Sequence, residues 1–143
     1  MIIGLANGCM DLFHNGHLHY LTESAFQCDY LIFAVNSDAS VKRLKGPERP
    51  IQDLAHRMQA IRRTGLAHAI IPFEGDVGRL LMCLRPDVLF KGYDHGKEAV
   101  QAIRRPGWKD GAGMDIVKVV HISHLPGHST TLQVNARKGT TAP

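Results

Sequence analysis

One stretch of this sequence decides the fold, Gly8-Cys9-Met10-Asp11-Leu12-Phe13-His14-Asn15-Gly16-His17. An apolar run typical of a buried strand, Ile2–Ala6, comes before it, and apolar residues with helical spacing follow it. The stretch therefore predicts a loop that leaves a strand and enters a helix. Gly8 would permit close backbone approach or a positive φ angle, and Gly16 lies at the predicted start of the helix.

The same loop has the composition of an anion site. The free N–H groups at a helix start and the helix dipole both attract negative charge. His14 and His17 are three residues apart, so both can face the same way at that helix start. Two imidazoles there could donate hydrogen bonds to charge that develops on a phosphoryl group.

Plainer interpretations of the loop stay open at this point. Asp11 is also typical of a turn or capping residue. A metal site is a rival interpretation, with ligands drawn from Cys9, His14, His17 and Cys28. Their spacing matches no common zinc pattern, so we expect no protein-bound metal.

Outside this loop, buried-strand patterns alternate with helical ones. Short apolar runs predict five strands, at 2–6, 30–35, 69–73, 88–90 and 116–122. Apolar stripes predict helices that contain Leu18, Leu21 and Ala25, then Leu54, Met58 and Ile61, then Val77, Leu80, Leu81 and Leu84. Ser129 could cap a last short helix, which brings the expected number of helices to about five.

This alternation predicts an α/β fold, a Rossmann-like, doubly wound, parallel five-stranded sheet with helices on both faces. Such sheets bind ligands beyond the carboxyl ends of their strands, where the strand order reverses. We therefore expect the site in the loops at 7–17, 36–50, 91–97 and 123–130.

Length and composition limit the classes of protein. The chain has 143 residues, which fits a single domain, expected over 1–137 with a flexible tail at 138–143. No apolar run approaches the roughly 20 residues that span a bilayer, and the start of the sequence has no signal-like pattern. Three cysteines without CxxC spacing favour a reducing cytoplasm. The formal charge of +4 suits anionic ligands but is mild for a nucleic-acid binder, so we expect neither nucleic acid nor a membrane as partner.

Basic residues gather in the segment 42–50, where Lys45 and Arg49 are the candidates for contact with a phosphate. A solvated basic loop is the alternative interpretation of this segment. Arg57 lies beside the apolar stripe of a predicted helix. It could either pair with a carboxylate or face the site.

The first loop resembles the G-x-F-D-x-x-H-x-G-H signature of the cytidylyltransferase-like nucleotidyltransferase superfamily. Within it, the chain most resembles the adenylyltransferase domain of the ADP-heptose synthesis enzymes, and then glycerol-3-phosphate cytidylyltransferase. The resemblance covers residues 2–136. It continues through Ala34–Gly46, Arg49-Pro50, Arg57, Pro86–Asp94 and Ser129-Thr130-Thr131.

The resemblance implies transfer of a nucleotidyl group from a nucleoside triphosphate, with ATP favoured over CTP, to a small sugar or polyol phosphate, with release of pyrophosphate. It implies catalytic roles for His14, His17, Lys45 and Arg49. It implies nucleotide contacts for Asn7, Gly8, Cys9, Met10, Asp11, Gly16, Lys91, Gly92, Asp94, Ser129, Thr130 and Thr131. Mg²⁺ would arrive with the triphosphate, held by phosphate oxygens and water, and the chain would form a homodimer by family analogy.

Two departures from the family pattern matter. Met10 replaces the usual Phe, a conservative apolar change. His124 stands where the cytidylyltransferase branch has an Arg, which favours the adenylyltransferase side. Two alternatives to the ATP reaction remain, a cytidylyltransferase acting on glycerol 3-phosphate or a related polyol phosphate, and a non-catalytic nucleotide-binding module. The segment 95–111 matches no family motif, and acceptor specificity could lie there.

Overall fold

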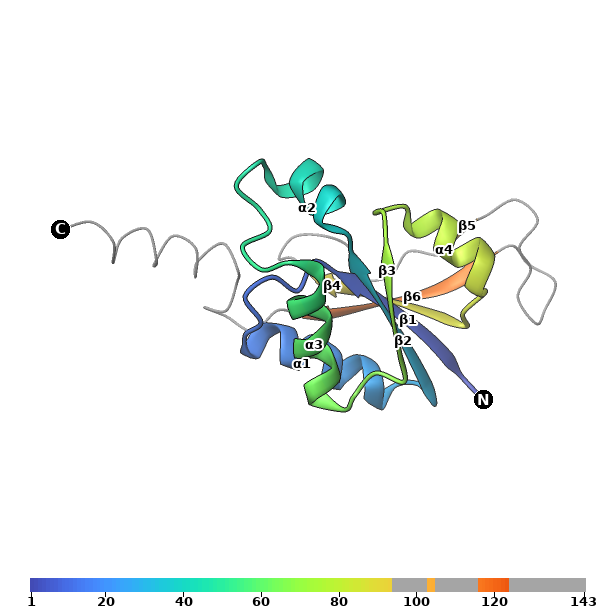
Figure 1. Ribbon diagram of the computed structural model, residues 1–143. Coiled ribbons are helices and arrows are strands. Elements are labelled where there is room, and N and C mark those ends of the chain that lie inside the picture. Colours follow the sequence, from blue (N-terminus) through green and yellow to red (C-terminus); the bar gives the residue numbers. More distant parts are fainter. Residues whose placement is uncertain (94–102, 105–115, 124–143) are drawn as a thin grey trace.

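The structure, a computed structural model, describes residues 1–93, 103–104 and 116–123. From β1 to β4, helices separate successive strands as the apolar pattern predicts, with two helices between β2 and β3 (Figure 1). In chain order the elements are β1 (Ile3–Gly8), α1 (Asn15–Phe26), β2 (Tyr30–Asn36), α2 (Asp38–Lys45), α3 (Leu54–Thr64), β3 (Ala69–Phe73), α4 (Val77–Leu84), β4 (Val88–Tyr93), β5 (Ile103–Arg104) and β6 (Ile116–Ser123).

The strands form one sheet in the order β3-β2-β1-β4-β6-β5. All pairs among the five longer strands are parallel, which confirms the predicted doubly wound arrangement. The chain builds outward from β1 through β2 to β3 and then returns to place β4 on the other side of β1. The strand order therefore reverses between β1 and β4, which is the position where such sheets bind ligands.

The five predicted parallel strands are present, and a two-residue strand too short for an apolar pattern to reveal, β5, adds to them by pairing antiparallel with β6. Two predictions about elements need correction. The segment Asp38–Lys45, expected within a loop, is the helix α2, because Ser37 caps it by accepting a hydrogen bond from the Ser40 amide. Lys91 and Gly92 lie inside β4 and not after it. The predicted helix at Ser129 and the tail lie outside the described residues.

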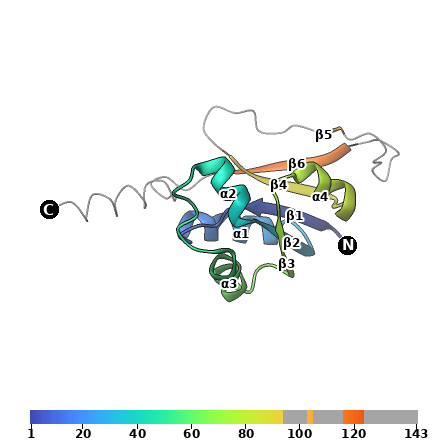
Figure 2. The same cartoon turned by 45° about the horizontal axis from the view of Figure 1, so that its top comes forward.

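Apolar side chains cover both faces of the sheet. On one face, residues of α1 and α3 such as Leu21 and Ile61 pack with Phe33 and Phe90. On the other face, α4 packs Leu81 against a second cluster of strand residues. Figure 2 shows α3 and α4 on opposite sides of the strands. Within the described part of the chain, no helix combines the length and apolar character needed to cross a membrane.

Candidate functional site

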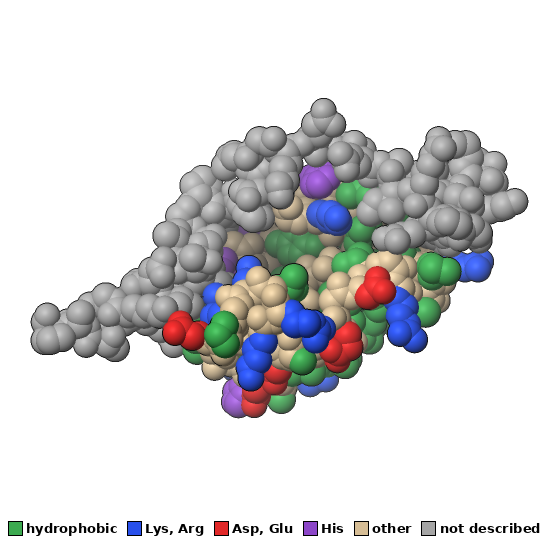
Figure 3. Space-filling model, turned by 90° about the horizontal axis from the view of Figure 1, so that it is seen from above, with side chains coloured by type: hydrophobic (Ala, Val, Ile, Leu, Met, Phe, Trp, Pro, Cys, Tyr) green, Lys and Arg blue, Asp and Glu red, His purple; other side chains and the backbone are tan. Residues whose placement is uncertain are grey.

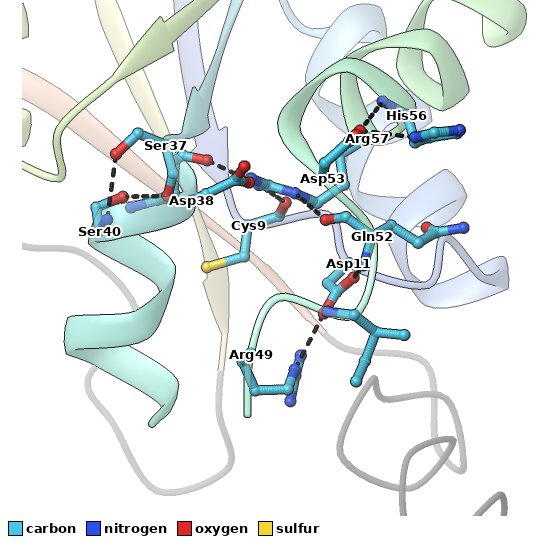
Figure 4. A network of polar contacts seen from close by, with 12 residues as sticks. Cys9, Asp11, Ser37, Asp38, Ser40, Arg49, Gln52, Asp53, His56 and Arg57 are labelled. Carbon is cyan, nitrogen blue, oxygen red and sulfur yellow. Dashed lines mark hydrogen bonds and ion pairs between the residues drawn. The ribbon is translucent and has the colours of Figure 1, made fainter. Parts of the chain in front are cut away.

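The loop between β1 and α1 has an unusual backbone. Met10 and Leu12 both adopt left-handed φ angles, 55° and 53°, although neither is a glycine. Both side chains are buried, so packing fixes these conformations. Asp11 lies between them and is turned toward the loop that precedes α3 (Figure 4). Left-handed non-glycine residues cost free energy and are concentrated at functional sites.

The carboxylate of Asp11 fastens two loops together. One oxygen accepts hydrogen bonds from Arg49 Nε at 3.0 Å and from the Ile51 amide at 2.8 Å, and the other accepts from the Gln52 amide at 2.9 Å. Burial by itself would raise the pKa of this carboxyl. The two amides and the Arg49 guanidinium outweigh burial and hold the pKa below its ordinary value of 3.8. These contacts support the structural interpretation of Asp11, in which its carboxylate orders the loop.

A second link joins the same two loops. The Gln52 side-chain oxygen accepts a hydrogen bond from the Leu12 amide at 3.2 Å. The Gln52 carbonyl accepts another from Arg57 Nε at 2.9 Å. Gln52 therefore holds both the loop after β1 and the helix α3.

Arg57 is the largest fully buried side chain among the described residues. Its Nη1 donates to the carbonyls of Cys9 and Asn36, both at 2.7 Å, and its Nη2 pairs with Asp38 at 2.6 Å. Of the two sequence interpretations of Arg57, the structure supports pairing with a carboxylate. Figure 4 shows this guanidinium between the carboxyl ends of β1 and β2 and the loop before α3.

The two histidines of the loop are held by the start of α1. His14 is the N-cap residue, and its Nδ1 accepts a hydrogen bond from the Gly16 amide at 3.0 Å. The Nδ1 of His17 accepts from the His14 amide at 3.2 Å. Because Nδ1 is the acceptor in both rings, each neutral imidazole carries its proton on Nε2 and is a donor there.

The basic segment is placed next to this loop. Arg49 is 8% exposed, and its Nε donates to Asp11, which fixes the guanidinium beside the loop of the histidines. Lys45 is exposed at the end of α2. Burial raises the pKa of the Cys9 thiol, while the positive charges of Lys45, Arg57 and Arg49 act in the opposite direction.

The carboxyl end of β4 lies on the other side of β1. Lys91 and Gly92 are exposed there, and Lys91 is in register with His121 on β6. The Tyr20 hydroxyl donates to the Phe90 carbonyl at 2.7 Å and accepts from the Asn7 amide at 3.4 Å. Tyr20 of α1 therefore ties β1 to β4 where the strand order reverses.

A hollow opens on the face of the molecule that Figure 3 shows from above. Some Lys or Arg and His side chains lie at its edge, and its visible floor is partly apolar. The remaining residues of the sequence prediction, Asp94 and Ser129–Thr131, lie outside the described residues, as does His124.

The alternative of a metal site in the first loop is not supported. Cys28 lies at the amino end of β1, where its sulfur is 2.9 Å from the position that a Gly4 Cβ would take. His14 and His17 lie beyond the opposite end of that strand. No group of three or more His, Cys, Asp or Glu residues within residues 1–93, 103–104 and 116–123 is arranged to hold a metal ion.

Sequence reasoning finds one of the two residues that connect the loops. An arginine beside the apolar residues Leu54, Met58 and Ile61 points to a buried charge that needs partners, and the structure supports the predicted pairing of Arg57 with a carboxylate. Gln52 is the residue that sequence reasoning misses. No pattern pointed to Gln52, whose contacts depend on the path of the chain.

The sequence of this chain is similar to those of several curated proteins. The chain is 42% identical to the bifunctional protein HldE of Hydrogenovibrio crunogenus over 130 residues, which cover 90% of this chain and 26% of that protein. It is 44% identical to the HldE of a Pseudomonas putida strain over 117 residues, which cover 81% of this chain and 22% of that protein. The chain thus spans about a quarter of the length of these curated relatives.

A solved structure is similar over nearly its full length. It is the lipopolysaccharide core biosynthesis protein from Thermoplasma volcanium, with a TM-score of 0.67 and 31% identity over 87% of this chain and 98% of that one. The family model described as cytidylyltransferase-like matches residues 5–132. With its paired histidines, basic loop and reversed strand order, this chain belongs to the cytidylyltransferase-like family of nucleotidyltransferases.

Proposed function

We propose that this chain transfers an adenylyl group from ATP to a small sugar phosphate such as heptose 1-phosphate and releases pyrophosphate. One observation carries the proposal. The stacked rings of His14 and His17 lie at the start of α1, and the loop that bears Arg49 is bound directly to the same segment through Asp11. This arrangement collects hydrogen-bond donors and positive charge at the ligand-binding edge of the sheet.

The proposed chemistry needs no nucleophilic side chain from the protein. An oxygen of the acceptor phosphate attacks the α-phosphorus of ATP, and the bond from that phosphorus to the bridging oxygen of the β-phosphate breaks. The electron pair leaves with pyrophosphate. Because the attacking oxygen is already an anion, the protein needs only to align the two substrates and stabilise charge.

The described residues support distinct parts of this task. His14 and His17 would direct their Nε2–H groups at the triphosphate, and the positive end of the α1 dipole would favour its negative charge there. Arg49 offers a flat pair of amino groups that suits phosphate oxygens, and Lys45 offers a mobile point charge. Lys91 and Gly92 would meet the nucleotide from the neighbouring strand β4.

Mg²⁺ would enter with the triphosphate. The carboxylate of Asp11 already accepts three hydrogen bonds, and that of Asp38 is paired with Arg57. The described site is therefore richer in donors than in metal ligands, which fits an ion held mainly by phosphate oxygens and water. When bound, the ion would neutralise part of the triphosphate charge.

The preference for ATP and a heptose phosphate rests on the relatives. At about 40% identity they include several proteins named bifunctional protein HldE, and the similar solved structure belongs to a protein named for lipopolysaccharide core biosynthesis. These names support surface-carbohydrate synthesis as the setting. We also propose a cytoplasmic location, where ATP and sugar phosphates are available, and a homodimer.

A matrix of substrates tests the proposal. Each of four nucleoside triphosphates is combined, with Mg²⁺, with heptose 1-phosphate, glycerol 3-phosphate, ribitol 5-phosphate and related phosphates, and pyrophosphate release is measured. We expect the highest kcat/KM for ATP with heptose 1-phosphate. If kcat/KM is highest with CTP and a polyol phosphate, the protein is a cytidylyltransferase and the proposal of adenylyl transfer is wrong. Nucleotide binding in calorimetry without turnover in any combination would make the chain a binding module.

A further inference from the structure

We propose that Arg57 is a positioning residue that sets the alignment of the two loops carrying His14 and Arg49, without touching either substrate. The inference rests on the proposed function, and it adds a residue to that reaction. It starts from an arginine whose side chain is fully buried although α3 lies at the edge of the site.

The guanidinium binds four different segments at once. Nη1 reaches the Cys9 carbonyl after β1 and the Asn36 carbonyl at the end of β2. Nε reaches the Gln52 carbonyl before α3, and Nη2 reaches Asp38 in the first turn of α2. Three of these partners are backbone carbonyls, whose positions define the path of the chain and not merely the pose of a side chain.

These bonds close a ring of contacts with Asp11. The Gln52 amide donates to Asp11 while the Gln52 carbonyl accepts from Arg57, so this residue is held from both sides. Arg57 also holds the Cys9 carbonyl, two residues before Asp11. A shift of the guanidinium would thus move the loop of His14 and the loop of Arg49 relative to each other.

Stability alone is a poor explanation for this arrangement. A buried ion pair is often no more stabilising than well-packed apolar residues of similar volume. The same helix already supplies apolar residues such as Met58 and Ile61 to the core. An apolar residue could not bind three carbonyls and a carboxylate, as the planar guanidinium of Arg57 does.

Arg57→Lys tests the proposal directly. Lysine keeps the charge but has one ammonium group in place of the planar fork, so it cannot hold four segments. A misplacement of about 1 Å can cost on the order of 100-fold in rate. We expect kcat per folded molecule to fall by roughly that factor, with a smaller change in KM for ATP. Arg62→Lys is the matched control, because Arg62 is exposed on the same helix, and it should behave like the wild type.

Hydrogen–deuterium exchange supplies a readout that does not depend on turnover. In folded Arg57→Lys, we expect faster exchange in peptides over 9–14 and 46–53, with unchanged exchange in the central strands. Wild-type kcat together with wild-type exchange in both loops would overturn the proposal, as would slower turnover without faster loop exchange. If the wild type turns over no substrate at all, the proposed function fails while the exchange result still decides the positioning role.

Asp38→Asn covers the case in which Arg57→Lys does not fold. The Asp38 side chain is 47% exposed, so asparagine in its place opens no cavity in the core, although the buried Arg57 guanidinium loses its carboxylate partner. A reduced kcat per folded molecule with faster exchange in the same two loops, both measured well below the melting temperature, would support the proposal. The proposal would be overturned if Arg57→Lys does not fold and a folded Asp38→Asn has wild-type kcat and wild-type exchange. Arg57 would then serve only the stability of the fold.

Discussion

The imidazole of His14 stacks on that of His17, with ring centroids 3.8 Å apart and planes 23° from parallel. Both rings use Nδ1 to accept a backbone amide at the start of α1. The helix start therefore fixes the orientation of both side chains and the position of their Nε2 protons. Side chains held in this way lose little entropy when a ligand arrives, which favours charge stabilisation by preorganised donors.

Two substitutions can separate the role of His14 as the N-cap of α1 from its proposed role in catalysis. His14→Asn keeps an N-cap side chain, whereas His14→Ala removes both the cap and the imidazole. We expect both variants to lose about 100-fold in kcat, because each loses one donor to the developing charge. Only His14→Ala should also lose about 1 kcal/mol in the free energy of unfolding, measured in urea. Equal stability of the two variants would contradict the capping role.

The hydrogen bonds to Asp11 make the fold sensitive to acid. The pKa of Asp11 is lower in the folded chain than its ordinary value of 3.8, so its contribution to stability is complete above that value. The contribution is lost as the pH falls through the folded pKa. We expect Asp11→Asn to be less stable by on the order of 3 kcal/mol at neutral pH, with a flatter pH dependence below about pH 5. Urea unfolding at several pH values measures the loss of stability and its pH dependence. If the free energy of unfolding changes with pH in the same way in Asp11→Asn and in the wild type, this account is wrong.

Gly4 offers a test of the scaffold that leaves the site alone. A Cβ at this position would lie 2.6 Å from Phe90 Cε2 and 2.9 Å from Cys28 Sγ, at the end of the sheet away from the histidines. We expect Gly4→Ala to lower the free energy of unfolding by about 1–3 kcal/mol through overpacking. Its kcat per folded molecule, measured well below the melting temperature, should match the wild type. A loss of kcat similar to that of His14→Asn would mean that the site responds to general strain.

The fold could be predicted because its signals are local. Each of the five longer strands is an apolar run, and the stripe containing Leu80, Leu81 and Leu84 marks α4 without reference to the rest of the chain. α2 escaped prediction because it is short and polar, and its start depends on one hydroxyl of Ser37. β5 has only two residues and exists through its pairing with β6.

The site could be predicted in part for a similar reason. His14 and His17 are close in sequence, so their spacing shows that they face together. Asp11 and Arg49 are 38 residues apart, and only the folded chain brings them within 3.0 Å. The same holds for Arg57, whose partners come from four segments. Pairing of this kind leaves no periodic trace in the sequence.

The central claim is that the histidines at the start of α1 catalyse nucleotidyl transfer, and His17→Ala tests it most directly. His19→Ala, on the same helix, is its control. The measurement is pyrophosphate release at saturating ATP, Mg²⁺ and heptose 1-phosphate. We predict robust turnover by the wild type and by His19→Ala, and a loss of more than about 100-fold in kcat for His17→Ala. Equal turnover by His17→Ala and the wild type would contradict the account.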